Sequence, residues 1–141
     1  MLFRSYSKQV GRPLYCVYSA IAFLNELGEI KATAIFDSYN GANINIHIYG
    51  PACITRGNYR KVLDYVFNEL KCTRMTAQIP RSNRKLLKTI PRLNFVFETV
   101  QKFYFGTNKE DDAITYRITP KEASKWIKID ENTKTASNSR F

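Results

Sequence analysis

The stretch that decides the fold runs from residue 55 to residue 105. It reads TRGNYRKVLDYVFNEL at residues 55–70 and KCTRMTAQIPRSNRKLLKTIPRLNFVFETVQKFYF at residues 71–105. Its pattern predicts a helix, a strand, a second helix and a second strand in succession. The predicted elements are an amphipathic helix at 59–70, a strand at 74–79, a basic helix that opens at Ser82-Asn83 and stops at Pro91, and a strand from 93 to about 105. Such an alternation is typical of an α/β fold.

The first helix is predicted by the spacing of its apolar side chains. They follow the i, i+3, i+4, i+7, i+8, i+11 series of one helical face: Tyr59, Val62, Leu63, Val66, Phe67 and Leu70. Gly57-Asn58 is the expected entry, because an asparagine side chain can accept hydrogen bonds from the first turn of a helix. We interpret the apolar face as core and expect any function to lie in the first turn.

Three strands are predicted before this helix. An apolar run at 15–24 predicts a buried strand, and a β-branched run at 30–36 predicts the next one, with a turn at Gly28 between them. Asn40-Gly41 is a strong hairpin signal. Residues 43–49 then alternate, with Ile44, Ile46 and Ile48 on one face and Asn43, Asn45, His47 and Tyr49 on the other. The polar, uncharged face fits either a groove wall or a solvated sheet face.

The C-terminal part adds one strand and one short helix. A polar turn at 106–112 precedes a strand at 113–118. Thr119 and Glu122 have the spacing of a capping box, with Pro120 at the first helical position, so a short helix carrying Trp126 should follow. Residues 128–141 lack periodicity and are expected to form a disordered tail, which leaves one domain over residues 1–127. The helix at 59–70 should cross over to a strand parallel to the third.

Composition restricts the partners. The chain has 22 Lys and Arg against 12 Asp and Glu, a formal net charge of +10, which favours phosphate-bearing cofactors, nucleic acid or an acidic protein surface. No apolar run reaches the roughly 20 residues of a membrane helix, and no apolar signal segment is visible, so we expect a cytoplasmic protein and no membrane partner. The three cysteines are widely spaced, which predicts reduced thiols: Cys16, Cys53 and Cys72. The single histidine, His47, argues against a histidine-based metal site.

Several short motifs carry a resemblance to a known family. They are residues 29–36, Ile46-His47-Ile48, residues 64–67, residues 74–80 followed by Ser82-Asn83, and Leu93-Asn94-Phe95 followed by Glu98. Their order and spacing, over about residues 18–127, resemble the GNAT superfamily of CoA-dependent N-acyltransferases, and in particular its small phage-encoded members. The resemblance implies an α/β fold with a mixed, mostly antiparallel sheet. It implies a strand-helix-strand-helix-strand core and a truncated N-terminal part.

The resemblance implies transfer of an acyl group, usually acetyl, from acetyl-CoA to an amine of a protein or small molecule. The strands at 44–49 and 74–79 would splay apart, and the pantetheine arm would pair with exposed strand backbone at Ile48 and Tyr49. The pyrophosphate would lie at the N-terminus of the crossover helix, near Arg56, Gly57, Asn58 and Arg60. Asn83 would contact the cofactor arm. Asn58 and Arg60 occupy positions that are small in the family, so Arg60 either reaches a phosphate or blocks the site.

Two residues are candidate general bases for an amine acceptor, and no metal is implied. His47 is one, because histidine ordinarily titrates near neutral pH, but a strand histidine can equally be structural. Glu98 is the other, and its alternative role is that of an ion partner for neighbouring basic residues. Tyr104 is a candidate donor of a proton to the leaving thiolate.

The alternatives to an enzyme rest on charge. The second helix carries basic side chains that could contact the CoA 3′-phosphate, bind nucleic acid or simply face solvent: Arg81, Arg84, Lys85, Lys88 and Arg92. A catalytically inactive GNAT-fold protein that binds a host protein or nucleic acid is therefore the second hypothesis, and a purely electrostatic nucleic-acid binder is the third. The shortened N-terminal part would leave the acceptor side open to a large partner or to a second copy in a homodimer.

Overall fold

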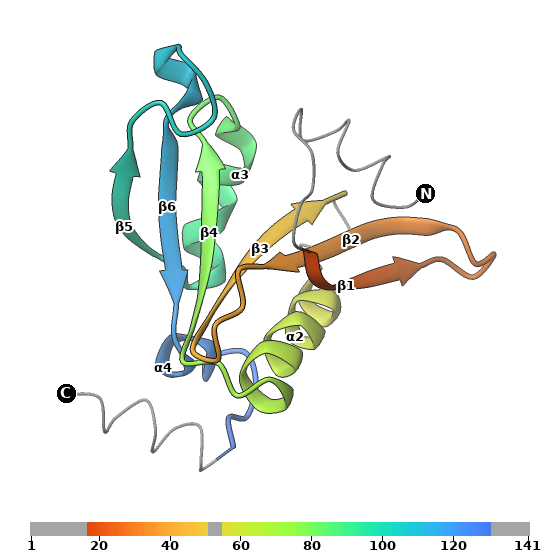
Figure 1. Cartoon of the computed structure of the whole chain (residues 1–141). Helices are drawn as coiled ribbons and strands as arrows, with labels where there is room; N and C mark the ends of the chain where they lie inside the picture. The colour runs from red at the N-terminus through yellow and green to blue at the C-terminus, as the bar shows by residue number, and fades with distance from the viewer. Residues whose placement is uncertain (1–16, 51–54, 131–141) are drawn as a thin grey trace.

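The protein is described by a computed structural model that covers residues 17–50 and 55–130. Within these ranges the chain forms a mixed sheet with helices against it (Figure 1). The elements are β1 Val17–Leu24, β2 Ile30–Asp37, β3 Asn43–Tyr49, α2 Arg56–Asp64, η2 Tyr65–Glu69, β4 Arg74–Pro80, α3 Arg84–Thr89, η3 Ile90–Leu93, β5 Val96–Gln101, η4 Lys109–Asp111, β6 Ala113–Ile118 and α4 Pro120–Ala123. The predicted order of strands and helices is confirmed.

The described strands form one six-stranded sheet in the order β1-β2-β3-β4-β6-β5. Only β3 and β4 are parallel, and every other pair of neighbours is antiparallel. The parallel pair requires a crossover, which α2 and η2 supply. The α/β class, the mostly antiparallel sheet and the crossover therefore agree with the prediction.

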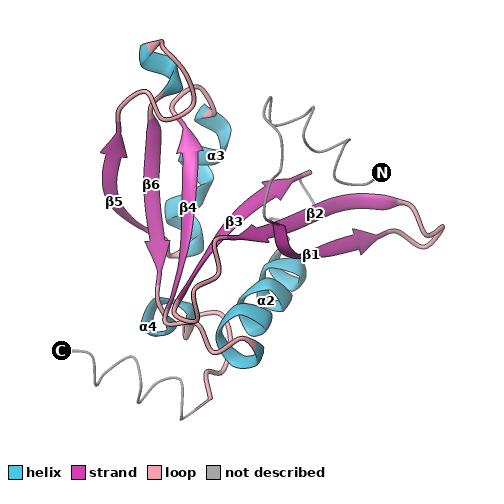
Figure 2. Cartoon of the chain, in the orientation of Figure 1, coloured by secondary structure: helices cyan, strands magenta, loops and turns pink. Residues whose placement is uncertain are grey.

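One hydrophobic core lies between the sheet and the helices. Phe36, Ile44 and Met75 are fully buried beneath Leu63 and Phe67 of the crossover helix. The half-buried leucines of α3 and the buried Ile90 of η3 pack against the same core. Figure 2 shows α2 and α3 on the same side of the sheet. The apolar faces predicted from helical and strand periodicity are therefore the faces that meet.

The crossover helix begins earlier than predicted. It starts at Arg56, and its N-cap is Thr55, whose Oγ1 accepts from the backbone N–H of Asn58 at 3.3 Å; the prediction of a cap at Asn58 is wrong. From Tyr65 the helix continues with wider π-helical turns, in which the N–H of Leu70 donates to the carbonyl of Tyr65 at 2.9 Å. The apolar stripe remains buried through this change.

Two strands differ from their predictions. The run at 15–24 is not a buried strand, because β1 is an edge strand whose alternate side chains face outward, with Tyr18 49% and Leu24 59% exposed. The strand predicted from residue 93 is β5, which starts at Val96. Asn94 has a left-handed backbone with φ +68°, which ends η3 and delays the strand. Asparagine tolerates this conformation better than most residues.

The C-terminal prediction is partly confirmed. Thr119 and Glu122 form the capping box of α4, but the helix ends at Ala123 and Trp126 lies beyond it. The prediction of disorder from residue 128 is wrong for the first three residues. Ile129 is buried, and Asn68 on η2 binds the carbonyl of Lys128 and the N–H of Asp130. The remaining residues of the predicted tail lie outside the described ranges, as do Cys16 and Cys53.

Within the described ranges, no helix has the length and apolar character needed to cross a membrane.

Candidate functional site

The parallel strands β3 and β4 separate after a short paired stretch. They pair at only three positions, where Asn43–Asn45 faces Arg74–Thr76. Beyond this point β3 stays paired with β2 as far as Tyr49, and β4 stays paired with β6 as far as Pro80. Because each strand follows its outer neighbour, a gap opens between them (Figure 1). The splay implied by the resemblance is confirmed.

A cavity of about 430 Å³ occupies this gap. Its apolar wall combines both strands with the helical layer: Ile46, Ile48, Ala77, Ile79, Leu86 and Ile90. Its polar lining comes from the strands, from the start of α3 and from the loop before β6: His47, Tyr49, Gln78, Ser82, Asn83 and Asp111. Since the strand residues alternate in direction, the lining draws on both faces of the sheet.

The edge of β3 that faces the cavity has no strand partner at Ile46–Ile48 within the described residues. An unpaired strand edge presents N–H and C=O groups that need hydrogen-bond partners. An extended ligand with amide groups can provide them, in the manner of an added strand. The cavity can therefore bind an extended, partly apolar molecule.

Asn83 lies at one end of the cavity and caps α3. Its side-chain Oδ1 accepts from the N–H of Leu86 at 3.3 Å, which satisfies one of the free donors of the first helical turn. Its Nδ2 has no hydrogen-bond partner among the described residues, and the side chain is exposed. This amide can therefore donate to a ligand while it continues to cap the helix.

The predicted pyrophosphate residues lie outside the cavity, on the first two turns of α2. Only four residues separate Gly50 from Thr55, so the N-cap of this helix lies within roughly 18 Å of Gly50, the residue that follows β3. A side chain added at Gly57 would meet no atom within 4 Å, so the space over its backbone is open. Arg60 does not enter the cavity, because its Nε donates to the carbonyl of Trp126 at 3.1 Å.

Arg56 is also directed toward the C-terminal segment. Its guanidinium carbon lies 5.8 Å from the centre of the Trp126 ring. Of the predicted cofactor-binding residues, the structure thus brings Ile48, Tyr49 and Asn83 to the cavity. It leaves Arg56, Gly57, Asn58 and Arg60 together at the start of α2.

His47 lies at the cavity and is held by an acidic residue. Its Nε2 is 2.6 Å from Oδ2 of Asp37, and the two side chains are 9% and 19% exposed. Asp37 is the last residue of β2 and pairs with Asn45, while His47 pairs with Ile35, so the two side chains are diagonal neighbours on one sheet face. Asp37 was missed in the sequence because it falls in a predicted turn, and its contact with His47 depends on the register of β2 against β3.

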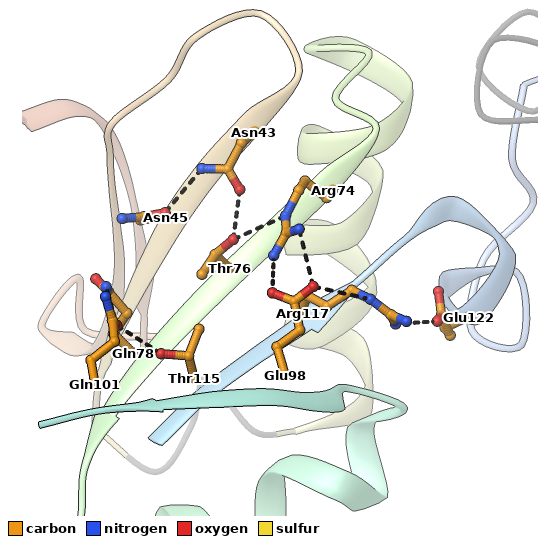
Figure 3. A network of polar contacts seen from close by, with 10 residues as sticks. All are labelled: Asn43, Asn45, Arg74, Thr76, Gln78, Glu98, Gln101, Thr115, Arg117 and Glu122. Carbon is orange, nitrogen blue, oxygen red and sulfur yellow. Dashed lines mark hydrogen bonds and ion pairs between the residues drawn. The ribbon is translucent and has the colours of Figure 1, made fainter. Parts of the chain in front are cut away.

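Glu98 does not line the cavity. It lies on β5, the outer strand, and its carboxylate binds the guanidinium of Arg74 at 2.5 and 3.1 Å and the Nε of Arg117 at 3.5 Å (Figure 3). Strands β4 and β6 separate it from β3. This arrangement corresponds to the alternative interpretation of Glu98, an ion partner for neighbouring basic residues.

Gln78 is a cavity residue that the sequence did not single out. Its Nε2 donates to Oε1 of Gln101 at 2.9 Å, and its Oε1 accepts from the hydroxyl of Tyr104 at 3.2 Å. Thr115 donates to the same Gln101 oxygen at 2.8 Å, as Figure 3 shows. The alternation of polar residues along β4 was a signal for Gln78. Tyr104 contacts the cavity only through this amide.

Cys72 and Asp112 have shifted pKa values, and neither residue lines the cavity. Burial raises the pKa of the Cys72 thiol to about 11, so this cysteine is protonated and unreactive at neutral pH. Asp112 is fully buried and accepts from the N–H of Phe103 at 2.9 Å. That backbone hydrogen bond is the main cause of its lowered pKa, with Lys102 and Arg81 also contributing. No metal-binding group of three or more His, Cys, Asp or Glu occurs among the described residues.

Comparison with known proteins places the fold. No protein-family model and no curated protein sequence matches the chain. Solved structures do match, including a mutant form of the spermidine/spermine N-acetyltransferase SpeG from Vibrio cholerae, with 15% identity, a TM-score of 0.64, and coverage of 73% of this chain and 67% of that one.

Two further SpeG structures from V. cholerae give similar values. The form in complex with manganese ions is 17% identical with a TM-score of 0.60, and covers 75% of this chain and 66% of that one. The dodecameric form in an intermediate state is 15% identical with a TM-score of 0.63, with the same coverage. The chain thus spans about two thirds of these proteins. At this identity the similarity shows a GNAT-like fold, and a narrower kinship with phage-encoded members stays a prediction.

Proposed function

We propose that this chain is a GNAT-fold N-acyltransferase, which takes an acyl group from acetyl-CoA or another acyl-CoA and transfers it to an amine of a protein or small molecule. The cavity between β3 and β4 carries the proposal. The pantetheine arm of CoA is an extended chain with two amide groups. A slot with an apolar wall and an unpaired strand edge at Ile46–Ile48 suits such a chain.

When bound, acyl-CoA supplies a thioester whose carbonyl carbon accepts the amine nitrogen while the carbon–sulfur bond breaks. In this proposal the β3 edge and Asn83 bind the arm, and the apolar wall excludes water. The helix dipole at the start of α2 favours the phosphates, with Arg56 and Arg60 nearby. His47 takes the proton that the amine loses.

The test is a binding measurement that separates the arm from the phosphates. Calorimetric titration of the full chain with acetyl-CoA should give one site, whereas adenosine 3′,5′-bisphosphate, which lacks the arm, should bind at least about tenfold more weakly. Equal affinities for the two ligands would mean attraction of phosphate to a basic protein without use of the cavity. Mass spectrometry of amine mixtures incubated with acetyl-CoA would then identify the acceptor.

A binding role without catalysis is the second candidate, and two observations favour it. Arg56 and Arg60 both contact Trp126 and do not line the cavity. The basic side chains of α3 and η3 are exposed and form no ion pair within the described residues: Arg84, Lys85, Lys88 and Arg92. A polyanion is the partner that such a surface fits.

Nucleic-acid binding would depend steeply on salt, because each neutralised phosphate releases counterions. The test is the affinity of the chain for a 20-base single-stranded DNA at 50 and 200 mM salt. A fall in affinity of roughly 10³-fold to 10⁵-fold, as expected for about six to ten phosphate contacts, would support the second candidate. A lack of acetyl-CoA binding in the same buffer would then exclude the transferase.

A further inference from the structure

Asp37 and His47 form a short, mostly buried polar contact beside the cavity. Its atoms Oδ2 and Nε2 are 2.6 Å apart, a short contact of the kind that an ionised carboxylate makes as an acceptor. We propose that Asp37 is a positioning residue, which holds His47 in the tautomer that leaves Nδ1 available as the base in acyl transfer. This proposal rests on the function proposed above.

The tautomer follows from the chemistry of the two groups. An ionised carboxylate can only accept hydrogen bonds, so the imidazole must donate to Asp37 through Nε2–H. A neutral imidazole that carries its proton on Nε2 has its lone pair on Nδ1. Among the described residues, no hydrogen-bond partner is found for Nδ1, and His47 is one of the residues that line the cavity. The free lone pair is therefore the one that an amine in the cavity can use.

The fold explains why the pair is rigid. Asp37 and His47 lie on adjacent strands that are hydrogen-bonded to each other, and the register holds from Thr33 opposite Tyr49 to Asp37 opposite Asn45. Neither side chain is more than one fifth exposed. A base that is held in one orientation and one tautomer avoids the cost of reorganisation during the reaction. An interaction of this kind affects the chemical step more than substrate binding.

The tautomer can be read directly, because His47 is the only histidine in the sequence. With the ring nitrogens labelled with ¹⁵N, long-range ¹H–¹⁵N spectra of the full chain should show a protonated Nε2 and an unprotonated Nδ1. In Asp37→Ala the acceptor is absent, and the nitrogen shifts should move toward those of an unconstrained imidazole that exchanges between its tautomers. A wild-type spectrum with the proton on Nδ1 would overturn the proposal without reference to activity.

Kinetics test whether the tautomer matters. Asp37→Asn has nearly the same shape, and its amide can turn either an acceptor or a donor toward Nε2. Its kcat should fall at least about tenfold, because general-base catalysis contributes about 10²-fold to 10⁴-fold. The KM for acetyl-CoA should remain close to that of the wild type. Glu69→Gln, which removes an equal charge on the exposed side of η2, should retain wild-type kcat.

The outcomes separate this proposal from the one on which it rests. If acetyl-CoA binds and is consumed, but Asp37→Asn retains its kcat while remaining folded, the positioning role is wrong and the transferase stands. If acetyl-CoA does not bind the wild type, the transferase fails, and the base role of His47 fails with it. The tautomer spectrum needs no variant, so a failure of Asp37→Ala to fold does not affect that test.

Discussion

Asn83 caps α3 and lines the cavity, so substitution can separate its capping role from the role proposed for it in binding acetyl-CoA. Its oxygen caps α3, and its amide nitrogen is available at the cavity. Asn83→Ala should lower stability by about 1 kcal/mol through loss of the cap, and should also weaken acetyl-CoA binding by roughly tenfold. Asn83→Asp keeps a capping oxygen but removes the donor, so it should weaken binding without loss of stability.

Urea unfolding and calorimetry measure these two effects independently. If both variants bind acetyl-CoA as tightly as the wild type does, Asn83 has no place in the cofactor site and serves only as a cap.

The buried carboxyl of Asp112 should make the stability of the fold depend on pH. Its pKa is lowered in the fold, first by the hydrogen bond from the N–H of Phe103. A carboxyl whose folded pKa is depressed stabilises the fold above its unfolded pKa and loses that contribution as pH falls through its folded pKa. Stability should therefore decline from about pH 4 downward.

Asp112→Asn should be less stable than the wild type at pH 7, and the difference should shrink toward pH 2. Urea midpoints at several pH values test this. The comparison is Glu69→Gln, which removes an exposed carboxylate on η2. A constant difference between Asp112→Asn and wild type at all pH values would contradict the titration of Asp112 as the cause.

At the scale of elements, the periodicity of apolar residues correctly predicted the buried faces of helices and strands, which depend on residues close in sequence. The apolar stripe from Tyr59 to Leu70 and the alternation along β3 both depend on residues a few positions apart, and both are found as expected. Contacts between distant elements were not predictable in this way. The hydrogen bond of Trp126 to Asn94, and the packing of Ile129, join segments that no local pattern relates.

The candidate site shows the same division. The resemblance supplied the splay and the position of Asn83, because both follow from the order of elements. The pairing of His47 with Asp37 requires the register of β2 against β3, and the removal of Glu98 from the cavity requires the strand order. Neither is contained in a motif.

A larger side chain in the gap between β3 and β4 tests whether acetyl-CoA binds there. Ala77 lies on β4, lines the cavity and is 5% exposed. Ala77→Phe should reduce acetyl-CoA affinity at least about tenfold, because the ring would occupy the space of the arm. Its loss of stability should be at the low end of the roughly 1–3 kcal/mol typical of overpacking, since the cavity offers room.

The matched control is Ala20→Phe, which adds the same ring to the exposed side of β1, far from the gap in strand order. Its acetyl-CoA affinity should equal that of the wild type. Tight binding by Ala77→Phe would show that the ligand lies elsewhere, for example on the basic surface of α3.

At the scale of the whole molecule, salt should affect ligand affinity differently if the ligand is held by the net charge of +10 than if it is held in the cavity. A ligand held mainly by phosphate attraction to exposed basic residues loses affinity as ionic strength rises, because surface charges are screened over about 8–10 Å at physiological salt. A ligand held by strand-edge hydrogen bonds and an apolar wall is affected much less.

Thermal unfolding with acetyl-CoA at increasing salt distinguishes the two. A ligand that binds only the folded state stabilises it by about 2.7 kcal/mol at 100 times its Kd. For a chain of this length, that corresponds to a rise of roughly 5–10 °C in Tm. We expect the rise to shrink only in part between 50 and 300 mM NaCl, because the proposal places the pantetheine arm between β3 and β4, while the rise caused by adenosine 3′,5′-bisphosphate should vanish. If both rises disappear together, the cavity contributes nothing to recognition, and the surface charge of the molecule accounts for all of its affinity for the nucleotide.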